Sequence, residues 1–306
     1  MCLLFKAQTR FLFHAHIKIK IPVFCPESCF DELFGVMERI DKLYNSYTTG
    51  SYIDLINRSA GSFVEVDNET VLLLQRVKKW SEFFSGAFDI TIMPLIRLWG
   101  FYKTEGVRVP TREELASTLQ QVNYQKIEIY GRQVRIGCRQ ELITGSFLKA
   151  YAVDKMVERL TAMGITDAII NAGGSTIRAI NNEAHPQWTV NVRRPEDGSM
   201  LYVLKVGNNC YTTSSQSETF VTINGRHYGH ILNPLTGYPS ANRQVGIITN
   251  SCMDGDIIST GLFLQTAKGF ATKMRQLQQL MDIEGYLVDE NGNIIETDGF
   301  QHYKKQ

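Results

Sequence analysis

The sequence contains no stretch that could cross a membrane, and it carries almost no net charge. Its unbroken apolar runs all stop short of the roughly 18 residues that a transmembrane helix needs. Lys and Arg together number 32 and Asp and Glu number 31, so the formal net charge is +1 at pH 7. Such a balance gives no reason to expect a nucleic-acid surface or an acidic tail. We therefore expect no nucleic-acid partner and no transmembrane segment.

The chain is also poor in cysteine motifs. It has six cysteines, with no C-x-x-C pair and no zinc spacing: Cys2, Cys25, Cys29, Cys138, Cys210 and Cys252. This scatter predicts reduced cysteines that lie mostly in the core. The first 20 residues have no leading basic region and no small-residue cleavage site, so they do not resemble a secretory signal. As written, the sequence predicts a cytoplasmic protein.

The chain does have enough apolar residues for a sizeable core. Hydrophobic residues make up 43% of its 306 positions, which suffices for one large domain or two ordinary ones. No linker, low-complexity tract or repeat divides it. Segments with helical periodicity and segments with strand periodicity occur in blocks rather than in strict alternation. We predict an α+β fold with a largely antiparallel sheet, built as a single domain over residues 1–306.

Hydrophobic periodicity and capping residues predict most of the individual elements. Helices are expected at 28–43, 51–57, 70–85, 146–163 and 256–279, the last of them broken at Gly269. Thr111 and Glu114 have the spacing of a capping box, which predicts a further short helix. Strands or hairpins are expected at 16–23, 126–137, 167–172 and 285–296, and the segment 176–249 should be rich in strands.

Residues 253–263, MDGDIISTGLF, are the most informative stretch for chemistry. If they begin a helix, Asp256 and Thr260 are four residues apart on one face, with Ser259 beside them. One carboxylate with one or two hydroxyls is an oxygen set that Mg²⁺ accepts, because this ion completes its shell with water and phosphate oxygens. The alternative is an ordinary helix start that is capped by Asp254 or Asp256.

Three other segments carry groups that suit a phosphate-containing ligand. His230 precedes an Asn-Pro-Leu-Thr-Gly turn, where it could act as a base, contact phosphate or simply be hydrogen-bonded in the turn. Gly173 and Gly174 follow a buried strand, and such a turn lets backbone N–H groups approach an anion. Ser146 and Lys149 lie at the expected start of a long helix, where N–H groups also favour an anion.

Two more segments have equally ordinary alternatives. Thr213 and Ser214 belong to a hydroxyl cluster at the end of a strand, which could bind phosphate or form a soluble loop. The segment Ala87-Phe88-Asp89 could wrap a planar ring, or it could be a buried Phe beside a capping Asp. None of these segments is specific by itself.

The order and spacing of these segments resemble one family, the FAD:protein FMN transferases of the ApbE type. The similar blocks lie between residues 44 and 265 and read SYTTGSYIDLINR, SGAFDITIMPLIRLWGF, VNYQKIEIYGRQVRIG, FLKAYAVD, INAGG, YTTSS, GHILNPLTGYPS and GDIISTGLF. The resemblance implies a T-fold-like α+β domain that binds FAD and Mg²⁺. It also implies transfer of FMN from FAD onto a Thr or Ser hydroxyl of an acceptor flavoprotein, such as an electron-transport subunit, with release of AMP.

The resemblance further implies roles for individual residues. The flavin nucleotide would be lined by Tyr47, Ala87, Phe88 and Asp89, and the pyrophosphate would lie near Lys149 and His230. The metal oxygens would come from Ser146, Asp256, Ser259 and Thr260. His230 or Asp256 could take the proton of the acceptor hydroxyl, and the sequence does not rank them. Members of this family are more often periplasmic or membrane-anchored.

The chain departs from the family pattern at several positions. Ile143, Ser175 and Asn233 stand where the family has acidic residues. Phe13-His14-Ala15 replaces a Met-Gly-Thr segment that packs on FAD in the family. These departures leave two alternatives: an FAD- or nucleotide-binding homologue with impaired catalysis, and an FAD pyrophosphatase that gives FMN and AMP.

Overall fold

A computed structural model describes residues 4–101, 107–216 and 219–305, and the chain forms two compact units. Unit 1 comprises Met1–Asp41, Phe147–Ser215 and Arg243–Gln306, and unit 2 comprises Lys42–Ser146 and Gln216–Asn242. The chain therefore passes between the units four times. Whether residues 1–306 act as a single domain stays a prediction. Among the helices of the described ranges, none is both long and apolar enough to span a membrane.

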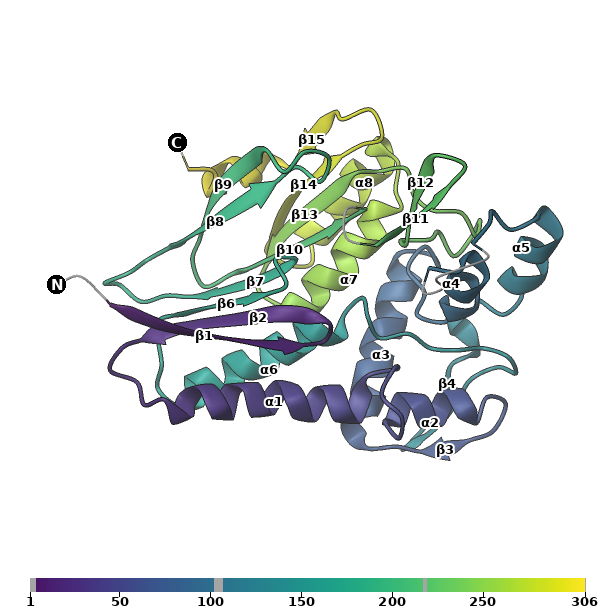
Figure 1. The fold of residues 1–306 in the computed structure, drawn as a ribbon, viewed down its shortest axis with the longest axis horizontal. Coiled ribbons are helices and arrows are strands. Elements are labelled where there is room, and N and C mark those ends of the chain that lie inside the picture. The colour runs from purple at the N-terminus through teal and green to yellow at the C-terminus, as the bar shows by residue number, and fades with distance from the viewer. Residues whose placement is uncertain (1–3, 102–106, 217–218, 306) are drawn as a thin grey trace. The chain divides into compact units, whose positions relative to one another are not determined.

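Unit 1 is built on an eight-stranded sheet in which all neighbouring strands are antiparallel (Figure 1). In spatial order its strands are β1 (Phe5–Leu12), β2 (Ala15–Pro22), β6 (Ala168–Ala172), β7 (Thr176–Ile180), β10 (Cys210–Ser215), β13 (Gln244–Thr249), β14 (Ile283–Val288) and β15 (Ile294–Glu296). Its helices are α1 (Ser28–Tyr44), α6 (Leu148–Ala162), α7 (Cys252–Phe263), α8 (Ala267–Gln278) and the 3-10 helix η2 (Asp298–Tyr303). The predicted α+β class with a largely antiparallel sheet is confirmed.

The two faces of this sheet are covered by different layers. On one face, Ile177 and Tyr211 belong to an apolar cluster that includes the hairpin of β8 (Trp188–Arg193) and β9 (Met200–Val206). Side chains alternate along a strand, so Thr176 and Thr212, the neighbours of those residues, point to the opposite face. Helix α7 packs there, on β7, β10 and β13. The hydroxyl groups of Thr176 and Thr212 therefore point toward the helical layer.

Several elements follow the predicted signals. The buried face of α1 has the expected spacing and consists of Phe30, Leu33, Phe34, Met37 and Ile40. Helix α5 (Arg112–Leu119) starts with the predicted capping box, in which the Thr111 hydroxyl and the Glu114 carboxylate each accept the other residue's backbone N–H. Helix α4 (Met93–Trp99) is not among the predicted elements; Pro94 lies in its first turn, where the missing N–H leaves no hydrogen bond unmade.

Other boundaries differ from the prediction. The predicted elements do not include strand β1. Its inward side chains Lys6 and Arg10 are polar, so the sequence shows no apolar alternation there, and they pair with acidic residues of the α1 region. The predicted break at Gly269 is wrong: the helices separate at 264–266, since the Thr266 hydroxyl caps α8 by accepting the Gly269 N–H at 3.2 Å. Helix α6 begins at Leu148, so Ser146 lies in the preceding turn.

Unit 2 combines short helices with small antiparallel sheets. Besides α4 and α5 its elements are α2 (Tyr52–Arg58), α3 (Asn68–Phe83), η1 (Tyr124–Lys126), β3 (Val64–Glu65), β4 (Glu128–Tyr130), β5 (Gln133–Arg135), β11 (Phe220–Ile223) and β12 (Arg226–Gly229). Trp99 is fully buried in its apolar core beside Leu95, Leu115 and Leu232. The Trp99 indole N–H donates to the Gly237 carbonyl at 2.8 Å, which fixes the Asn-Pro-Leu-Thr-Gly turn to this core.

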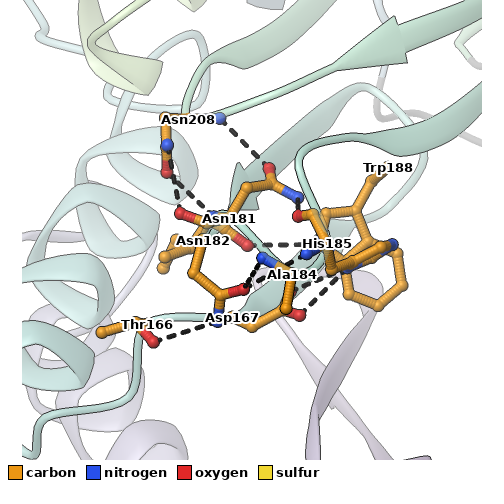
Figure 2. Close-up of polar contacts among 9 residues, drawn as sticks. Thr166, Asp167, Asn181, Asn182, Ala184, His185, Trp188 and Asn208 are labelled. Carbon is orange, nitrogen blue, oxygen red and sulfur yellow. Dashed lines mark hydrogen bonds and ion pairs between the residues drawn. The ribbon is translucent and has the colours of Figure 1, made fainter. Parts of the chain in front are cut away.

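The loop between β7 and β8 is held by a polar network in unit 1 (Figure 2). Asn181 and Asn208 exchange three hydrogen bonds of 2.8 to 3.2 Å. His185 Nδ1 lies 3.0 Å from both carboxylate oxygens of Asp167, a residue that is 2% exposed. The Trp188 ring packs edge-on against the His185 ring at 4.6 Å between centroids. These contacts anchor the base of the β8–β9 hairpin.

Candidate functional site

The residue that caps the start of α7 is neither Asp254 nor Asp256. Ser251 is the N-cap, and its hydroxyl accepts the backbone N–H of Asp254 at 3.3 Å. The Asp154 carboxylate, from α6, accepts the N–H groups of Cys252 and Met253 at 2.8 and 3.0 Å. Capping by Asp254 or Asp256 is therefore wrong, and Asp256 lies inside the helix.

Asp256 is held from the neighbouring sheet. It is 9% exposed, and the hydroxyl of the fully buried Thr176 lies 3.1 Å from each of its carboxylate oxygens. A side chain at Gly255 would reach within 2.6 Å of the Thr212 hydroxyl oxygen, so glycine permits this close approach of helix and sheet. The Thr212 hydroxyl is buried and has no hydrogen-bond partner among the described residues. Thr176 and Thr212 are directly paired on β7 and β10.

The hydroxyls of Ser259 and Thr260 turn toward the same strand, β10. Each donates to the Asp256 carbonyl, at 3.0 and 2.9 Å. The Ser214 hydroxyl lies 2.8 Å from Ser259 Oγ and 3.3 Å from Thr260 Oγ1. Thr213 points to the other face of β10, where its hydroxyl donates to the Val245 carbonyl at 2.8 Å. The structure thus brings together all of these predicted residues except Thr213.

Lys149 and the two glycines form a second polar group in unit 1. The Lys149 ammonium donates to the Ala172 carbonyl at 3.0 Å and to the Ser175 hydroxyl at 2.6 Å. Gly173 and Gly174 have φ of 69° and 76°, in the left-handed region that favours glycine. A side chain at Gly173 would lie 3.3 Å from the Lys149 ammonium. The predicted lysine and glycine turn are therefore adjacent.

The segment that departs from the family pattern near the N-terminus lies against this turn. Phe13 and His14 form the connection between β1 and β2, with φ of 51° and 57°. A Cβ at Gly173 would meet the Ala15 Cβ at 2.9 Å, and the Gly173 N–H donates to the His16 carbonyl at 3.0 Å. Close packing thus explains why residues 15 and 173 are both small.

In unit 2, residues 143 and 144 are hydrogen-bonded next to both predicted flavin segments, Tyr47 and residues 87–89. Ser46, next to the 45%-exposed Tyr47, receives a hydrogen bond from the Thr144 amide and donates its own amide to the Thr144 hydroxyl at 3.0 Å. The Ile143 N–H donates to the Ile90 carbonyl at 2.8 Å, which ties the same segment to residues 87–90. Ile143 is 8% exposed in the apolar core, so this position is filled by packing rather than by a carboxylate.

Asp89 is engaged by its own unit. Its carboxylate accepts the Thr91 N–H and hydroxyl at 2.8 and 2.7 Å, and the Tyr124 N–H at 2.7 Å. Burial raises the pKa of Asp89, although these hydrogen bonds lower it. Ala87 and Phe88 are 5% and 3% exposed. The buried-Phe alternative therefore describes this segment well, and its contact with flavin stays a prediction.

His230 is oriented by a main-chain contact. Its Nδ1 lies 3.0 Å from the Thr219 carbonyl, and its own N–H donates to the same oxygen at 3.1 Å. A carbonyl can only accept, so Nδ1 carries a proton and Nε2 is the acceptor atom of the neutral ring. Asn233 follows, and its side-chain oxygen accepts the Leu235 N–H at 2.8 Å. An amide oxygen at residue 233 thus fulfils the turn-forming role of a carboxylate.

The metal prediction depends on hydroxyls as much as on carboxylates. In the ranges that the structure describes, no three His, Cys, Asp or Glu side chains form a metal-binding group. Unit 1 offers one carboxylate, Asp256, with the hydroxyls of Ser259 and Thr260 one turn away. Such a set fits an ion that keeps most of its shell for water and phosphate oxygens. Ser146 belongs to unit 2 and stays a predicted ligand.

Two positioning residues are absent from the predicted site, Asp154 and Thr176. Asp154 closes the FLKAYAVD block, five residues after Lys149, and Thr176 follows the glycine pair by two residues. Neither spacing signals a contact by itself, because both contacts join elements that are far apart in sequence. Only the order of strands and helices reveals them.

Comparisons with known proteins identify the family of the chain. A family model described as ApbE family matches residues 13–287. A Klebsiella pneumoniae protein named FAD:protein FMN transferase is 29% identical over 280 residues, covering 88% of this chain and 84% of that protein. A Vibrio cholerae protein of the same name is 25% identical over 283 residues, covering 89% and 81%.

Solved structures show the same fold. The ApbE protein of Thermotoga maritima superposes with a TM-score of 0.91 at 24% identity, covering 99% of this chain and 100% of that chain. The flavinyl transferase ApbE of Pseudomonas stutzeri, in its apo form, gives a TM-score of 0.84 at 22% identity, covering 98% and 96%.

Proposed function

Since the chain belongs to the ApbE family, we propose that it transfers the FMN half of FAD onto a Thr or Ser hydroxyl of an acceptor flavoprotein. In this reaction the acceptor oxygen bonds to the phosphorus of FMN, and the bond from that phosphorus to the bridging oxygen of the pyrophosphate breaks. AMP leaves with the bridging oxygen, and the hydroxyl proton passes to a base. Flavin transfer also accords with the names of the relatives that cover most of the chain.

The observation that carries the proposal is the cluster of Asp256, Ser259 and Thr260 on α7, supported from the sheet by Thr176 and Ser214. Both α7 hydroxyls donate their hydrogens to the Asp256 carbonyl, so oxygen lone pairs remain for an electropositive ligand. A cluster rich in oxygen and poor in carboxylates suits a cation shared with a phosphate-containing substrate.

We assign Mg²⁺ to Asp256, Ser259 and Thr260 of unit 1, and the role of Ser146 stays a prediction from the family resemblance. When bound, Mg²⁺ neutralises negative charge on the pyrophosphate oxygens. The protein's own part is to hold the ligand oxygens of its side chains in place. The Thr176 hydroxyl does so for the Asp256 carboxylate, to which it donates a hydrogen bond. The shape of the cluster is therefore fixed by buried side chains.

Lys149 supplies a positive charge beside the glycine turn. Its two hydrogen-bond acceptors, the Ala172 carbonyl and the Ser175 hydroxyl, are uncharged. Because Ser175 replaces an acidic residue of the family pattern, its side chain does not neutralise the ammonium. Lys149 can therefore bind a phosphate oxygen with its full charge.

For the proton of the acceptor hydroxyl we propose His230 rather than Asp256. The Thr219 carbonyl fixes the proton on Nδ1, which leaves Nε2 as the atom that can accept. Asp256 already receives the Thr176 hydroxyl and is assigned to the metal. In unit 2, Tyr47 and residues 87–89 are proposed to contact flavin. In unit 1, Gly173, Gly174 and Ser214 are proposed to contact phosphate oxygens.

The transfer assay tests the proposal directly. Purified protein is incubated with FAD, MgCl₂ and a candidate acceptor flavoprotein, and the acceptor is examined on a denaturing gel for covalent flavin fluorescence. We expect a fluorescent acceptor band that disappears with EDTA or when the acceptor Thr is changed to Val. An active ApbE relative serves as the positive control.

Product analysis without acceptor separates the alternatives. Release of FMN and AMP from FAD, with no labelled acceptor in the full assay, would identify an FAD pyrophosphatase instead. Binding of FAD without either reaction would identify a homologue with impaired catalysis. Either result contradicts the proposed transfer.

A further inference from the structure

Asp154 connects two helices that carry proposed site residues. It lies on α6, one and a half turns after Lys149, and is partly buried. Its carboxylate accepts three hydrogen bonds from the start of α7: the Ser251 hydroxyl at 3.0 Å and the Cys252 and Met253 N–H groups at 2.8 and 3.0 Å. The cap of α7 is thus supplied partly by another helix.

A cap of this kind fixes position as well as stability. An ordinary N-cap, such as Thr266 on α8, bonds only within its own helix and cannot locate that helix against a neighbour. Asp154 instead holds two consecutive N–H groups of α7, and two bonds to one carboxylate restrict both the position and the rotation of the helix end. Asp256 follows Met253 by three residues, so it lies less than one turn from these bonds.

The other end of this connection is also fixed. Lys149 is held at the glycine turn by the Ala172 carbonyl and the Ser175 hydroxyl. A single rigid helix therefore has one side chain at the proposed phosphate-binding turn and another on the helix of the proposed metal ligands. The distance between the Lys149 ammonium and the Asp256 carboxylate therefore depends on the position of α6.

The carboxylate of Asp154 also acts electrostatically on its surroundings. Burial raises the pKa of the fully buried Cys210 thiol, and the carboxylates of Asp154 and Asp256 raise it further. The negative charge of Asp154 also faces the positive end of the α7 dipole, which favours its three hydrogen bonds.

We infer that Asp154 is a positioning residue that sets the α7 metal ligands in register with Lys149. This inference rests on the proposed function, because it assigns a purpose to the same site. It predicts that loss of the Asp154 carboxylate weakens metal binding by Asp256, Ser259 and Thr260. Loss of a helix cap elsewhere should weaken metal binding less. The contact of Asp154 with α7 is itself independent of the reaction.

The experiment compares Asp154→Ala and Asp154→Asn with the control Thr266→Ala in the full chain. Thr266→Ala removes a cap from α8, which carries none of the proposed site residues. Three quantities are measured: hydrogen exchange of the amides of residues 252–255, binding of Mn²⁺ followed by the EPR signal of the free ion, and kcat and KM for FMN transfer. Mn²⁺ is used because it accepts the same oxygen ligands as Mg²⁺ and is observed without turnover.

We expect Asp154→Ala to speed amide exchange at the start of α7 and to weaken Mn²⁺ binding about 10- to 100-fold, as losses of residues that orient metal ligands do. The kcat for transfer should fall more than KM rises. Asp154→Asn keeps one acceptor oxygen and should give a smaller change of the same kind. Thr266→Ala should lower the melting temperature without altering Mn²⁺ binding.

The inference is overturned if Asp154→Ala, or Asp154→Asn where the alanine variant does not fold, lowers only the melting temperature and binds Mn²⁺ like the wild type. It is also overturned if the wild type binds no Mn²⁺. If the wild type binds Mn²⁺ but transfers no FMN, the proposed function fails. In that case Mn²⁺ binding and amide exchange still decide the role of Asp154.

Discussion

Two aspartates are buried in different units, and their carboxylates are held in different ways. Asp89 in unit 2 accepts the N–H groups of Thr91 and Tyr124 and the Thr91 hydroxyl, and it thereby fastens two loops to each other. The carboxylate of Asp256 in unit 1 receives the hydroxyl of Thr176, and the hydroxyls of Ser259 and Thr260, about one turn later, donate to the Asp256 main-chain carbonyl.

The difference shows how a buried acidic residue that supports a fold can be distinguished from one that suits a ligand. A carboxylate bonded to main-chain N–H groups stabilises loops, which would otherwise contain unsatisfied donors. A carboxylate among hydroxyls offers an oxygen-rich set to a cation, because hydroxyls can donate to protein groups while their oxygens accept. Loss of Asp256 should therefore affect turnover, and loss of Asp89 should affect stability.

The largest effect is expected for Asp256→Ala. FMN transfer should fall about 10³-fold, because charge on the pyrophosphate is no longer neutralised at this position. The initial rate of acceptor labelling measures the change, and circular dichroism confirms that the variant is folded. Transfer within threefold of the wild type would remove Asp256 from the proposed metal site.

Asp89→Ala should mainly change the free energy of unfolding. Three donors lose their acceptor in a buried region, so we expect a loss of about 3 kcal/mol in urea unfolding. Transfer by the fraction that remains folded should decrease much less than in Asp256→Ala. A stable Asp89→Ala protein with abolished transfer would instead place this carboxylate among the groups that contact the substrate.

A matched pair of substitutions sharpens the comparison. Thr176→Val and Thr91→Val each remove one hydroxyl that donates to an aspartate, with little change in volume. Thr176→Val should weaken Mn²⁺ binding about tenfold. Thr91→Val should leave Mn²⁺ binding unchanged and cost about 1 to 2 kcal/mol of stability, because the Asn123 N–H also loses its acceptor. Equal effects of the two variants on Mn²⁺ binding would contradict the distinction.

The smallest effect is a pH dependence linked to Asp89. Burial raises the pKa of Asp89 above its ordinary value of 3.8, so the folded state binds its proton more tightly than the unfolded state. The resulting stabilisation is complete below pH 3.8 and is lost as the pH rises through the folded pKa. Compared with Asp89→Asn, the wild type should therefore become more stable as the pH falls from 7 to 4. Urea unfolding at several pH values measures this, and an opposite slope would mean that hydrogen bonding dominates over burial.

Local signals predict the local parts of this fold. The capping box of Thr111 and Glu114 and the buried face of α1 depend on residues within a few positions of one another, so the sequence contains all of the information they require. Glycine weakens helices, so the sequence predicts the break between α7 and α8 at Gly269, whereas the Thr266 cap decides it. Competing local signals can be weighed only when their hydrogen bonds are known.

The site depends more strongly on contacts between distant segments. The stretch from Asp256 to Thr260 is predicted because its spacing places oxygens on one helix face. The supporting residues Thr176 and Asp154 lie 80 and about 100 positions away from the groups they contact. No periodicity links such positions, so the sheet order and the packing of α6 on α7 are needed to find them. The resemblance to the family predicts the reaction, but it does not distinguish a residue that binds the ligand from a residue that holds it in place.

The strand order of unit 1 has a consequence for synthesis on the ribosome. Strand β13, which begins at Gln244, lies between β10 and β14, and β2 pairs with β6 across more than 140 residues of chain. The sheet therefore cannot be completed until nearly the whole polypeptide has been made. Until β13 has been made, β10 lacks one of its two strand neighbours, and an unpaired strand edge of this kind favours aggregation of the incomplete chain.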